Sequence, residues 1–217
     1  MLKFGDWINR KRHNRGFGIQ SPAAFFFITQ VLKERLPYYA YGELEEIARN
    51  SRGMSAKKCK ELFRIANYLK PDSSITVGSP TAACAICSAR KNIPHTLITA
   101  EKNTQTDTAK HLELHDCRQI HGNVPALLKE VLVNSRSLGI LYIGECDGRQ
   151  QLLDTAMQHT CKNSIIVIEG IHRDKNAKEM WKKAIENPAT IITYDLYSTG
   201  ILLFNDERIK QNYKLKR

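Results

Sequence analysis

The residues best placed to do chemistry surround the turn after the apolar segment 74–78. Gly78 allows the backbone to approach a ligand closely, and Ser79 precedes a helix of small residues. A second apolar segment ends in Glu101 about 20 residues further on, which is the spacing at which doubly wound folds hold a nucleotide-like ligand. The turn has one glycine where such turns usually have two or three. We therefore expect Gly78, Ser79 and Glu101 to contribute to a ligand site.

Further acidic groups and a histidine follow two later apolar segments. Glu145 and Asp147 come after the segment 138–144, and Glu169 and His172 come after 164–169. The carboxyl ends of parallel strands meet at one edge of a sheet, so these side chains are expected to converge there. Carboxylates would suit Mg²⁺ or Ca²⁺. Because no pair has the spacing of an established metal motif, we expect no metal cofactor.

Two other spacings have both a chemical and a structural interpretation. Cys84 and Cys87 form a C-x-x-C, which is redox active in a thioredoxin-like setting, but the surrounding small-residue helix favours packed thiols. His111 and His115 are four residues apart and share one helix face, an arrangement that can bind a metal. Without a third ligand nearby in the sequence, we expect these histidines to lie on a solvated face.

The chain alternates between strand and helix after residue 70. Only residues 198–200 separate the last two strands, so that pair must be antiparallel. Continuous apolar strands such as 140–143 and 165–168 are typical of a sheet covered on both faces. The sequence therefore predicts an α/β fold with a seven-stranded, mostly parallel sheet that ends in an antiparallel hairpin. The expected strands are 74–78, 95–101, 117–121, 138–144, 164–169, 190–197 and 200–205, and the expected helices between them are 81–91, 104–115, 124–135, 149–159 and 174–186.

The first part of the chain differs from the rest. Ser21 and Pro22 are a helix-start signal for a helix to about residue 35, and further helices are expected at 43–49 and 56–69. We expect residues 1–53 to form a helical N-terminal extension and residues 54–217 to form the α/β domain. The aromatic residues of the extension are expected to pack on the carboxyl edge of the sheet or on a second subunit, with a lid over an apolar acceptor as the alternative.

The composition is that of a basic chain with enough apolar residues for one large core. Lys and Arg number 33 against 22 Asp and Glu, a net charge of +11, and 42% of residues are hydrophobic. This charge suits a polyanionic partner, but aromatic residues are not interleaved with the basic clusters as base stacking requires. No apolar run is long enough to span a bilayer, no secretory signal is evident, and the six cysteines suit a reducing compartment. We therefore expect a cytoplasmic globular protein without a membrane partner.

The order of elements resembles the class I S-adenosylmethionine-dependent methyltransferases, whose sheet is Rossmann-like. The likeness is greatest to small O-methyltransferase-like proteins with a helical N-terminal extension. It covers nearly the whole chain and rests on the segments 18–25, 37–41, 167–172 and 194–201 together with Trp181. The resemblance implies S-adenosylmethionine as cofactor and a small-molecule hydroxyl as acceptor.

The resemblance assigns a role to each cofactor residue. The backbone at Gly78 and Ser79 would approach the methionine part of the cofactor. Glu101 would accept hydrogen bonds from the ribose hydroxyls, and Asn123 would lie near the adenine. Each of the last two residues also has a purely structural interpretation. Glu101 would then be a surface acid at a strand end, and Asn123 would be a turn residue after Gly122.

Four positions depart from the family pattern. Thr76 stands in place of the usual acid before the turn, and Ala82 in place of a second glycine. Gly144 takes the place of a metal-binding aspartate, and Gly170 that of the second acid after the fifth strand. The motifs are therefore degenerate. Glu169 or His172 is the expected general base.

Three functions remain open at this point. The leading hypothesis is methyl transfer from S-adenosylmethionine to a small-molecule hydroxyl. The second is a methyltransferase fold kept as a binding or assembly protein, with a homodimer formed through the N-terminal helices. The third is RNA binding or RNA methylation, which rests on the net charge alone.

Overall fold

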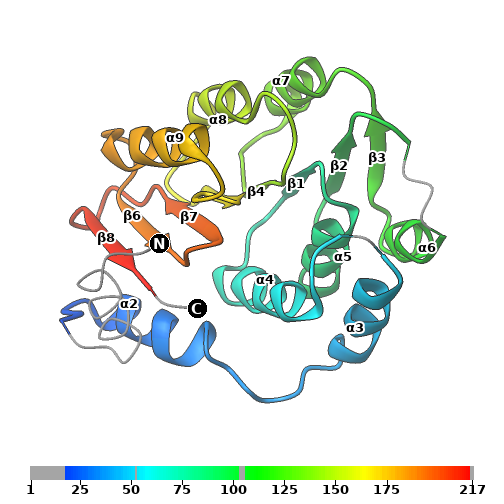
Figure 1. The fold of residues 1–217 in the computed structure, drawn as a ribbon, viewed down its shortest axis with the longest axis horizontal. Coiled ribbons are helices and arrows are strands. Elements are labelled where there is room, and N and C mark those ends of the chain that lie inside the picture. Colours follow the sequence, from blue (N-terminus) through cyan, green and yellow to red (C-terminus); the bar gives the residue numbers. More distant parts are fainter. Residues whose placement is uncertain (1–17, 52, 103–105, 216–217) are drawn as a thin grey trace.

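The computed structural model describes residues 18–51, 53–102 and 106–215 and contains one eight-stranded sheet (Figure 1). The strand order is β3-β2-β1-β4-β5-β7-β6-β8, with β7 antiparallel to both of its neighbours and the other pairs parallel. The strands are β1 (Ser74–Val77), β2 (His95–Thr99), β3 (Arg118–His121), β4 (Ile140–Ile143), β5 (Ile165–Glu169), β6 (Ile192–Asp195), β7 (Thr199–Leu203) and β8 (Gln211–Lys214). The predicted Rossmann-like sheet with its antiparallel hairpin is confirmed.

The eighth strand was missed by the sequence analysis. β8 lies at the edge of the sheet and pairs in parallel with β6, and only Tyr213 of its four residues is buried. A continuous apolar run predicts a central strand, and an edge strand with one buried side chain has no such run.

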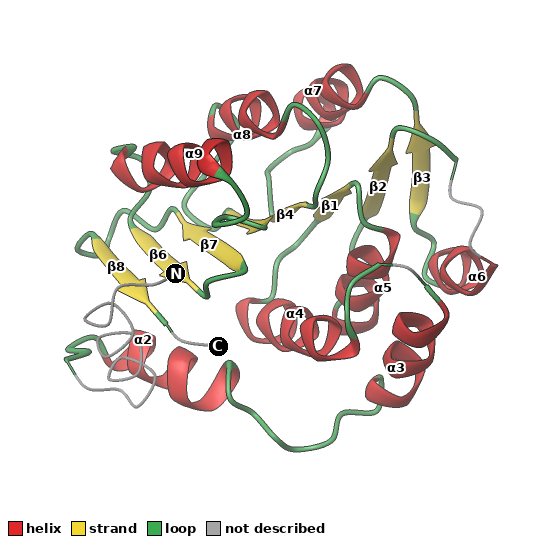
Figure 2. Ribbon diagram, in the orientation of Figure 1, coloured by secondary structure: helices red, strands yellow, loops and turns green. Residues whose placement is uncertain are grey.

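Helices cover both faces of the sheet (Figure 2). One face carries α4 (Ala56–Leu69), α5 (Pro80–Ala89) and α6 (Thr106–Leu114), and the other carries α7 (Val124–Asn134), α8 (Arg149–Met157) and α9 (Lys175–Glu186). Alternate side chains of each central strand enter opposite cores. In β4, Ile140 and Tyr142 pack toward α4 and α5, whereas Leu141 and Ile143 pack toward α7 and α8. This two-sided burial explains the continuous apolar strands.

The N-terminal helices are α2 (Pro22–Phe26), the π-helical turn η1 (Phe27–Val31) and α3 (Tyr41–Asn50). The Ser21 hydroxyl accepts a hydrogen bond from the Ala24 amide at 3.3 Å, which confirms the predicted helix start, but the helix ends at Val31 instead of near residue 35. The buried residues of these helices share one core with the sheet. The boundary at residue 53 remains a prediction.

The aromatic residues of the N-terminal segment do not lie at the carboxyl edge, so this part of the prediction was wrong, whereas their packing on a second subunit remains a prediction. The Phe27 ring packs 4.6 Å from the Tyr194 ring and lines a cavity with Ile165, where β5 begins. The Tyr39 hydroxyl donates to the Ser88 carbonyl near the end of α5. Both positions are on the amino side of the parallel strands. Ile165 is the first residue of β5, and α5 ends at Ala89, shortly before β2 begins.

The prediction of a solvated face was also wrong for His111. Its imidazole is 2% exposed and lies between the Ser88 hydroxyl, 3.0 Å from Nε2, and the Glu43 carboxylate, 2.7 Å from Nδ1. Contacts of α6 with α3 and α5 bury this face. Cys84 and Cys87 are buried without a disulfide in α5, and burial raises the pKa of the Cys84 thiol. None of the helices within the described ranges has the length and apolar character needed to cross a bilayer.

The buried His95 gives a pH-dependence prediction. Its Nδ1 lies 2.6 Å from the Ser74 hydroxyl and its Nε2 lies 2.6 Å from the Arg90 carbonyl, and burial lowers the pKa of the imidazole. The unfolded chain therefore binds a proton at His95 more readily than the folded chain. The contribution of the neutral, buried imidazole to stability is complete above the pKa of His95 in the unfolded chain and is lost as the pH falls. We expect His95→Gln to flatten the decline in unfolding free energy between about pH 7 and pH 5, measured by urea titration. His159→Gln, at a half-buried site after α8, should leave that slope unchanged.

Candidate functional site

The turn after β1 has the geometry expected of a ligand-binding turn. Gly78 is left-handed, with φ of +73°, and its amide donates to the Ile98 carbonyl of β2 at 2.9 Å. The Ser79 hydroxyl caps α5 by accepting from the Ala82 amide at 3.3 Å. A Cβ at Gly78 would lie 3.3 Å from the Cys146 Cβ and would be strained by the positive φ. The tight turn therefore requires glycine and places the start of α5 at the carboxyl edge.

Glu101 and Asn123 follow the two strands beyond β1 at the same edge. Glu101 is exposed, and its carbonyl accepts from the Thr99 hydroxyl at 2.6 Å. Asn123 is the N-cap of α7, with its side-chain oxygen accepting from the Ala126 amide at 3.1 Å. The capping contact agrees with the turn interpretation of Asn123, and its role near adenine remains a prediction.

The loop between α3 and α4 lies against the start of α5, which the sequence analysis did not predict. The Ser51 hydroxyl lies 3.1 Å from the Thr81 hydroxyl, and a Cβ on Gly53 would come within 2.3 Å of that same oxygen. Asn50 donates to Asp107 on α6 at 2.8 Å. The N-terminal helices therefore reach the carboxyl edge through this loop and not through their aromatic residues.

Glu169 at the end of β5 is held by side chains from other elements. Its Oε1 is 2.5 Å from the Lys58 ammonium on α4, and its Oε2 accepts from the Tyr142 hydroxyl at 2.6 Å. Burial, followed by the charge of Glu169, raises the pKa of Tyr142 well above its ordinary value, so the phenol stays protonated and donates. Arg149 donates to the Glu169 carbonyl at 2.5 Å. Lys58 and Tyr142 were missed because their contacts with Glu169 are distant in sequence.

Loss of the lysine in this network should lower stability. Lys58→Met leaves the Glu169 carboxylate, only 14% exposed, without its cation. Since Lys58 itself is 27% exposed, we expect a loss of about 1–2 kcal/mol in unfolding free energy, less than for a fully buried pair. Lys57→Met, at the exposed neighbouring position, should change stability by less than about 0.5 kcal/mol in the same urea titration. Equal effects of the two substitutions would mean that the ion pair contributes nothing.

His172 forms a second polar pair at this edge. Its Nε2 lies 2.8 Å from Oδ2 of Asp195, a side chain only 3% exposed at the end of β6. Asp195 Oδ1 accepts from the Tyr197 amide at 2.8 Å, and the His172 ring stacks on the Tyr197 ring at 5.6 Å. Tyr197 has φ of +71°, an uncommon value for a non-glycine residue, of the kind that concentrates at functional sites. A carboxylate that orients an imidazole is the arrangement of a general base.

The positions at which the resemblance places metal-binding acids are closed to side chains. A Cβ at Gly144 would lie 2.9 Å from the Val77 carbonyl oxygen. Gly170 has φ of +66°, and a Cβ there would lie 2.8 Å from the Glu145 carboxylate, which pairs with Arg173 at 3.0 Å. No three potential ligands from His, Cys, Asp and Glu come together within the described ranges. These residues do not fit the metal site of metal-dependent O-methyltransferases.

The order of strands, the antiparallel β7 and the turn at Gly78 define the fold of class I S-adenosylmethionine-dependent methyltransferases. Solved structures of such proteins match the chain at low sequence identity. The methyltransferase PaMTH1 of Podospora anserina, bound to S-adenosylhomocysteine (SAH), matches with a TM-score of 0.62 and 12% identity over 95% of this chain and 99% of its own. A second match is TomG, an O-methyltransferase of Streptomyces achromogenes involved in tomaymycin synthesis and solved with S-adenosylmethionine. Its TM-score is 0.59 and its identity 12%, over 94% of this chain and 99% of its own.

An O-methyltransferase of Bacillus cereus in complex with SAH gives a TM-score of 0.58 and 8% identity over 82% of this chain and 95% of its own. No protein-family model matches the sequence, and a search of curated proteins found no relative. Likeness at this level of identity establishes the fold alone.

Proposed function

We propose that the protein binds S-adenosylmethionine at the carboxyl edge of its sheet and transfers the methyl group to a small-molecule hydroxyl. The observation that carries the proposal is the left-handed Gly78 turn at the end of β1, with Glu101 exposed after the neighbouring strand. The fold adds support, because the structural neighbours from P. anserina, S. achromogenes and B. cereus contain this cofactor or its product.

Three groups of this chain would hold the cofactor. The Gly78 backbone leaves room for close approach, and the Ser79 cap fixes the first turn of α5 beside it. The Glu101 carboxylate has the two oxygens needed to accept both ribose hydroxyls. The cofactor supplies an electrophilic methyl group. The contribution of the protein is to align the acceptor oxygen with that methyl and to exclude water.

His172 is the proposed general base. Asp195 would orient its imidazole and stabilise the cation that forms when the ring takes the acceptor's proton. Glu169 is the second candidate, but its carboxylate oxygens already contact Lys58 and Tyr142. Because both of its oxygens are engaged, Glu169 is better suited to holding Lys58 in position than to abstracting a proton from the acceptor.

Replacing Glu101 tests the cofactor site. Glu101→Ala removes the ribose contact from an exposed position, so folding should be unaffected, and we expect SAH to bind about 10–100-fold more weakly in calorimetric titration. Glu130→Ala removes an exposed acid from α7 and should leave the affinity unchanged. The same affinity in both variants would show that Glu101 does not contact the cofactor.

The second candidate function is a binding protein that has lost turnover. It is favoured by the polar pairs at the ends of β4 and β5, where Glu145 contacts Arg173 and Glu169 contacts Lys58. Phe25 and Phe26 are 44% and 49% exposed on α2, which suits the predicted homodimer. SAH binding without release of product from any hydroxyl acceptor would favour this candidate, and sedimentation analysis would give the oligomeric state.

A further inference from the structure

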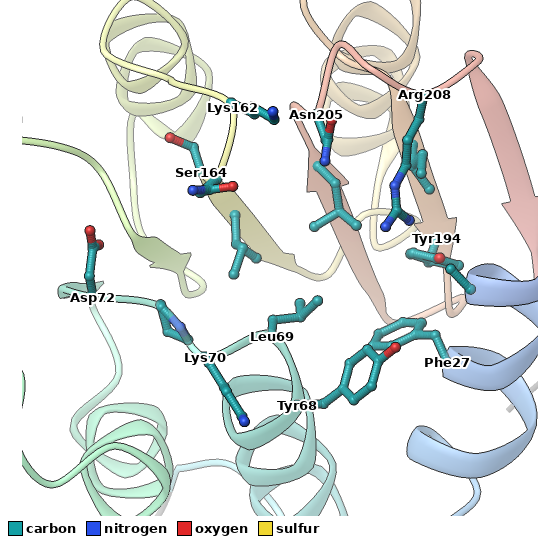
Figure 3. Close-up of a pocket in the computed structure, with 16 residues that line it drawn as sticks. Phe27, Tyr68, Leu69, Lys70, Asp72, Lys162, Ser164, Tyr194, Asn205 and Arg208 are labelled. Atoms are coloured by element: carbon teal, nitrogen blue, oxygen red, sulfur yellow. The ribbon is translucent and has the colours of Figure 1, made fainter.

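A cavity of about 380 Å³ lies at the amino edge of the sheet, opposite the proposed cofactor site (Figure 3). It is bounded by the N-terminal helical turns, by the end of α4, and by the first residues of β5 and β6. Its lining combines aromatic rings with basic side chains, a combination that the proposed methyl transfer does not use.

Aromatic rings form one wall of the cavity. Phe27 lies 4.6 Å from the Tyr194 ring and 5.7 Å from the Tyr68 ring, centroid to centroid. On its other side Tyr194 stacks on Tyr213 at 5.3 Å, which fixes the orientation of the Tyr194 ring. Rigid rings beside an open volume suit a planar apolar ligand, because stacking and edge contacts cost little side-chain entropy.

The hydroxyl of Tyr194 supplies a polar group within this wall. The residue is 2% exposed and lines the cavity, and its hydroxyl is not among the fully enclosed side-chain atoms that lack a partner in the described part of the chain. Burial raises the pKa of Tyr194, so the group stays a protonated donor. Because this hydroxyl is not fully enclosed, it can donate a hydrogen bond to an acceptor oxygen of a ligand in the cavity.

Positive charge lies next to this hydroxyl. Arg208 extends from the loop between β7 and β8 toward Tyr194, and its guanidinium makes no ion pair or side-chain hydrogen bond with other described residues (Figure 3). Lys70 lines the same cavity from a left-handed position with φ of +50°. The cavity also contains Lys162, which pairs with Glu207, and Asp72, which accepts from the Ser137 hydroxyl at 3.2 Å. Arginine is well suited to binding a carboxylate.

We propose that this cavity binds a small planar aromatic molecule that carries one carboxylate. The ligand ring contacts Tyr68, which is 38% exposed, and the edges of the Phe27 and Tyr194 rings. The carboxylate accepts hydrogen bonds from the Arg208 guanidinium and the Tyr194 hydroxyl. This site is separate from the proposed cofactor site, so the two proposals stand or fall independently.

Calorimetric titration of the full chain with 2-naphthoate tests the proposal, with the neutral 2-naphthamide as a second probe. The wild type should bind naphthoate at least about 10-fold more tightly than the amide, because the charge-assisted contacts need the carboxylate. Arg208→Gln should weaken naphthoate binding about 10-fold or more, and Tyr194→Phe, which keeps the ring, about 5-fold. Both variants should change the affinity for the amide less than the affinity for naphthoate, because the uncharged amide oxygen accepts weaker hydrogen bonds.

Arg118→Gln is the matched control, since Arg118 is an exposed arginine on β3 at the far end of the sheet. It should bind naphthoate as the wild type does. The proposal is overturned if naphthoate does not bind at millimolar concentration, if the amide binds equally well, or if Arg118→Gln weakens binding as much as Arg208→Gln.

Discussion

Replacing His172 with asparagine should reduce methyl transfer by about 10²–10⁴-fold while leaving SAH affinity unchanged. Asparagine keeps a hydrogen-bond donor for Asp195 but cannot take a proton from the acceptor. The imidazole of the wild type lies 2.8 Å from that buried carboxylate, which holds the ring in one orientation. Release of SAH with a panel of phenolic and alcoholic acceptors measures turnover, and calorimetry measures binding.

His159→Gln is the matched control for this substitution. His159 follows α8, whose end lies on the amino side of the sheet, so its loss should leave both turnover and binding intact. Equal turnover in the wild type and in His172→Asn would exclude His172 as the base. An inactive wild type that still binds SAH would instead favour the binding-protein function.

Gly144→Asp, which restores the acid of metal-dependent relatives, should destabilise the fold and create no metal site. Its Cβ would lie 2.9 Å from the Val77 carbonyl and 3.3 Å from the Ser79 Cβ, so the turn after β1 has to move. Overpacking and a poorly solvated carboxylate together should lower the unfolding free energy by about 3 kcal/mol. The melting temperature should fall by about 6–12 °C, with no recovery on addition of Mg²⁺.

Gly42→Asp places the same side chain in the first turn of α3, where nothing lies within 4 Å of the new Cβ. An acid near a helix N-terminus is favourable, so this variant should be as stable as the wild type or slightly more stable. A stable Gly144→Asp variant whose melting temperature rises with Mg²⁺ would contradict the account of this position.

The sheet was predictable because its signals are local. Buried strands such as β4 and β5 are continuous apolar runs, and the short link from Leu196 to Ser198 forces β6 and β7 to pair antiparallel. β8 gave no such signal, since its residues are mostly polar and its position depends on pairing with a distant strand. Burial of His111 depends in the same way on how α6 packs on α3 and α5.

The candidate site was predictable only at the strand ends. Gly78, Glu101 and His172 follow strands, so their common edge could be inferred from the order of elements. Their partners could not, because Lys58 reaches Glu169 across 111 positions and Asp195 reaches His172 from another strand. Long-range side-chain contacts of this kind leave no spacing pattern in the sequence.

A crystal structure of the protein grown with SAH tests the central claim most directly. We expect the ligand at the carboxyl edge, with its amino-acid part over the Gly78 turn and its ribose hydroxyls bonded to Glu101. Density for the ligand at any other place, or a carboxyl edge without ligand at saturating concentration, would contradict it.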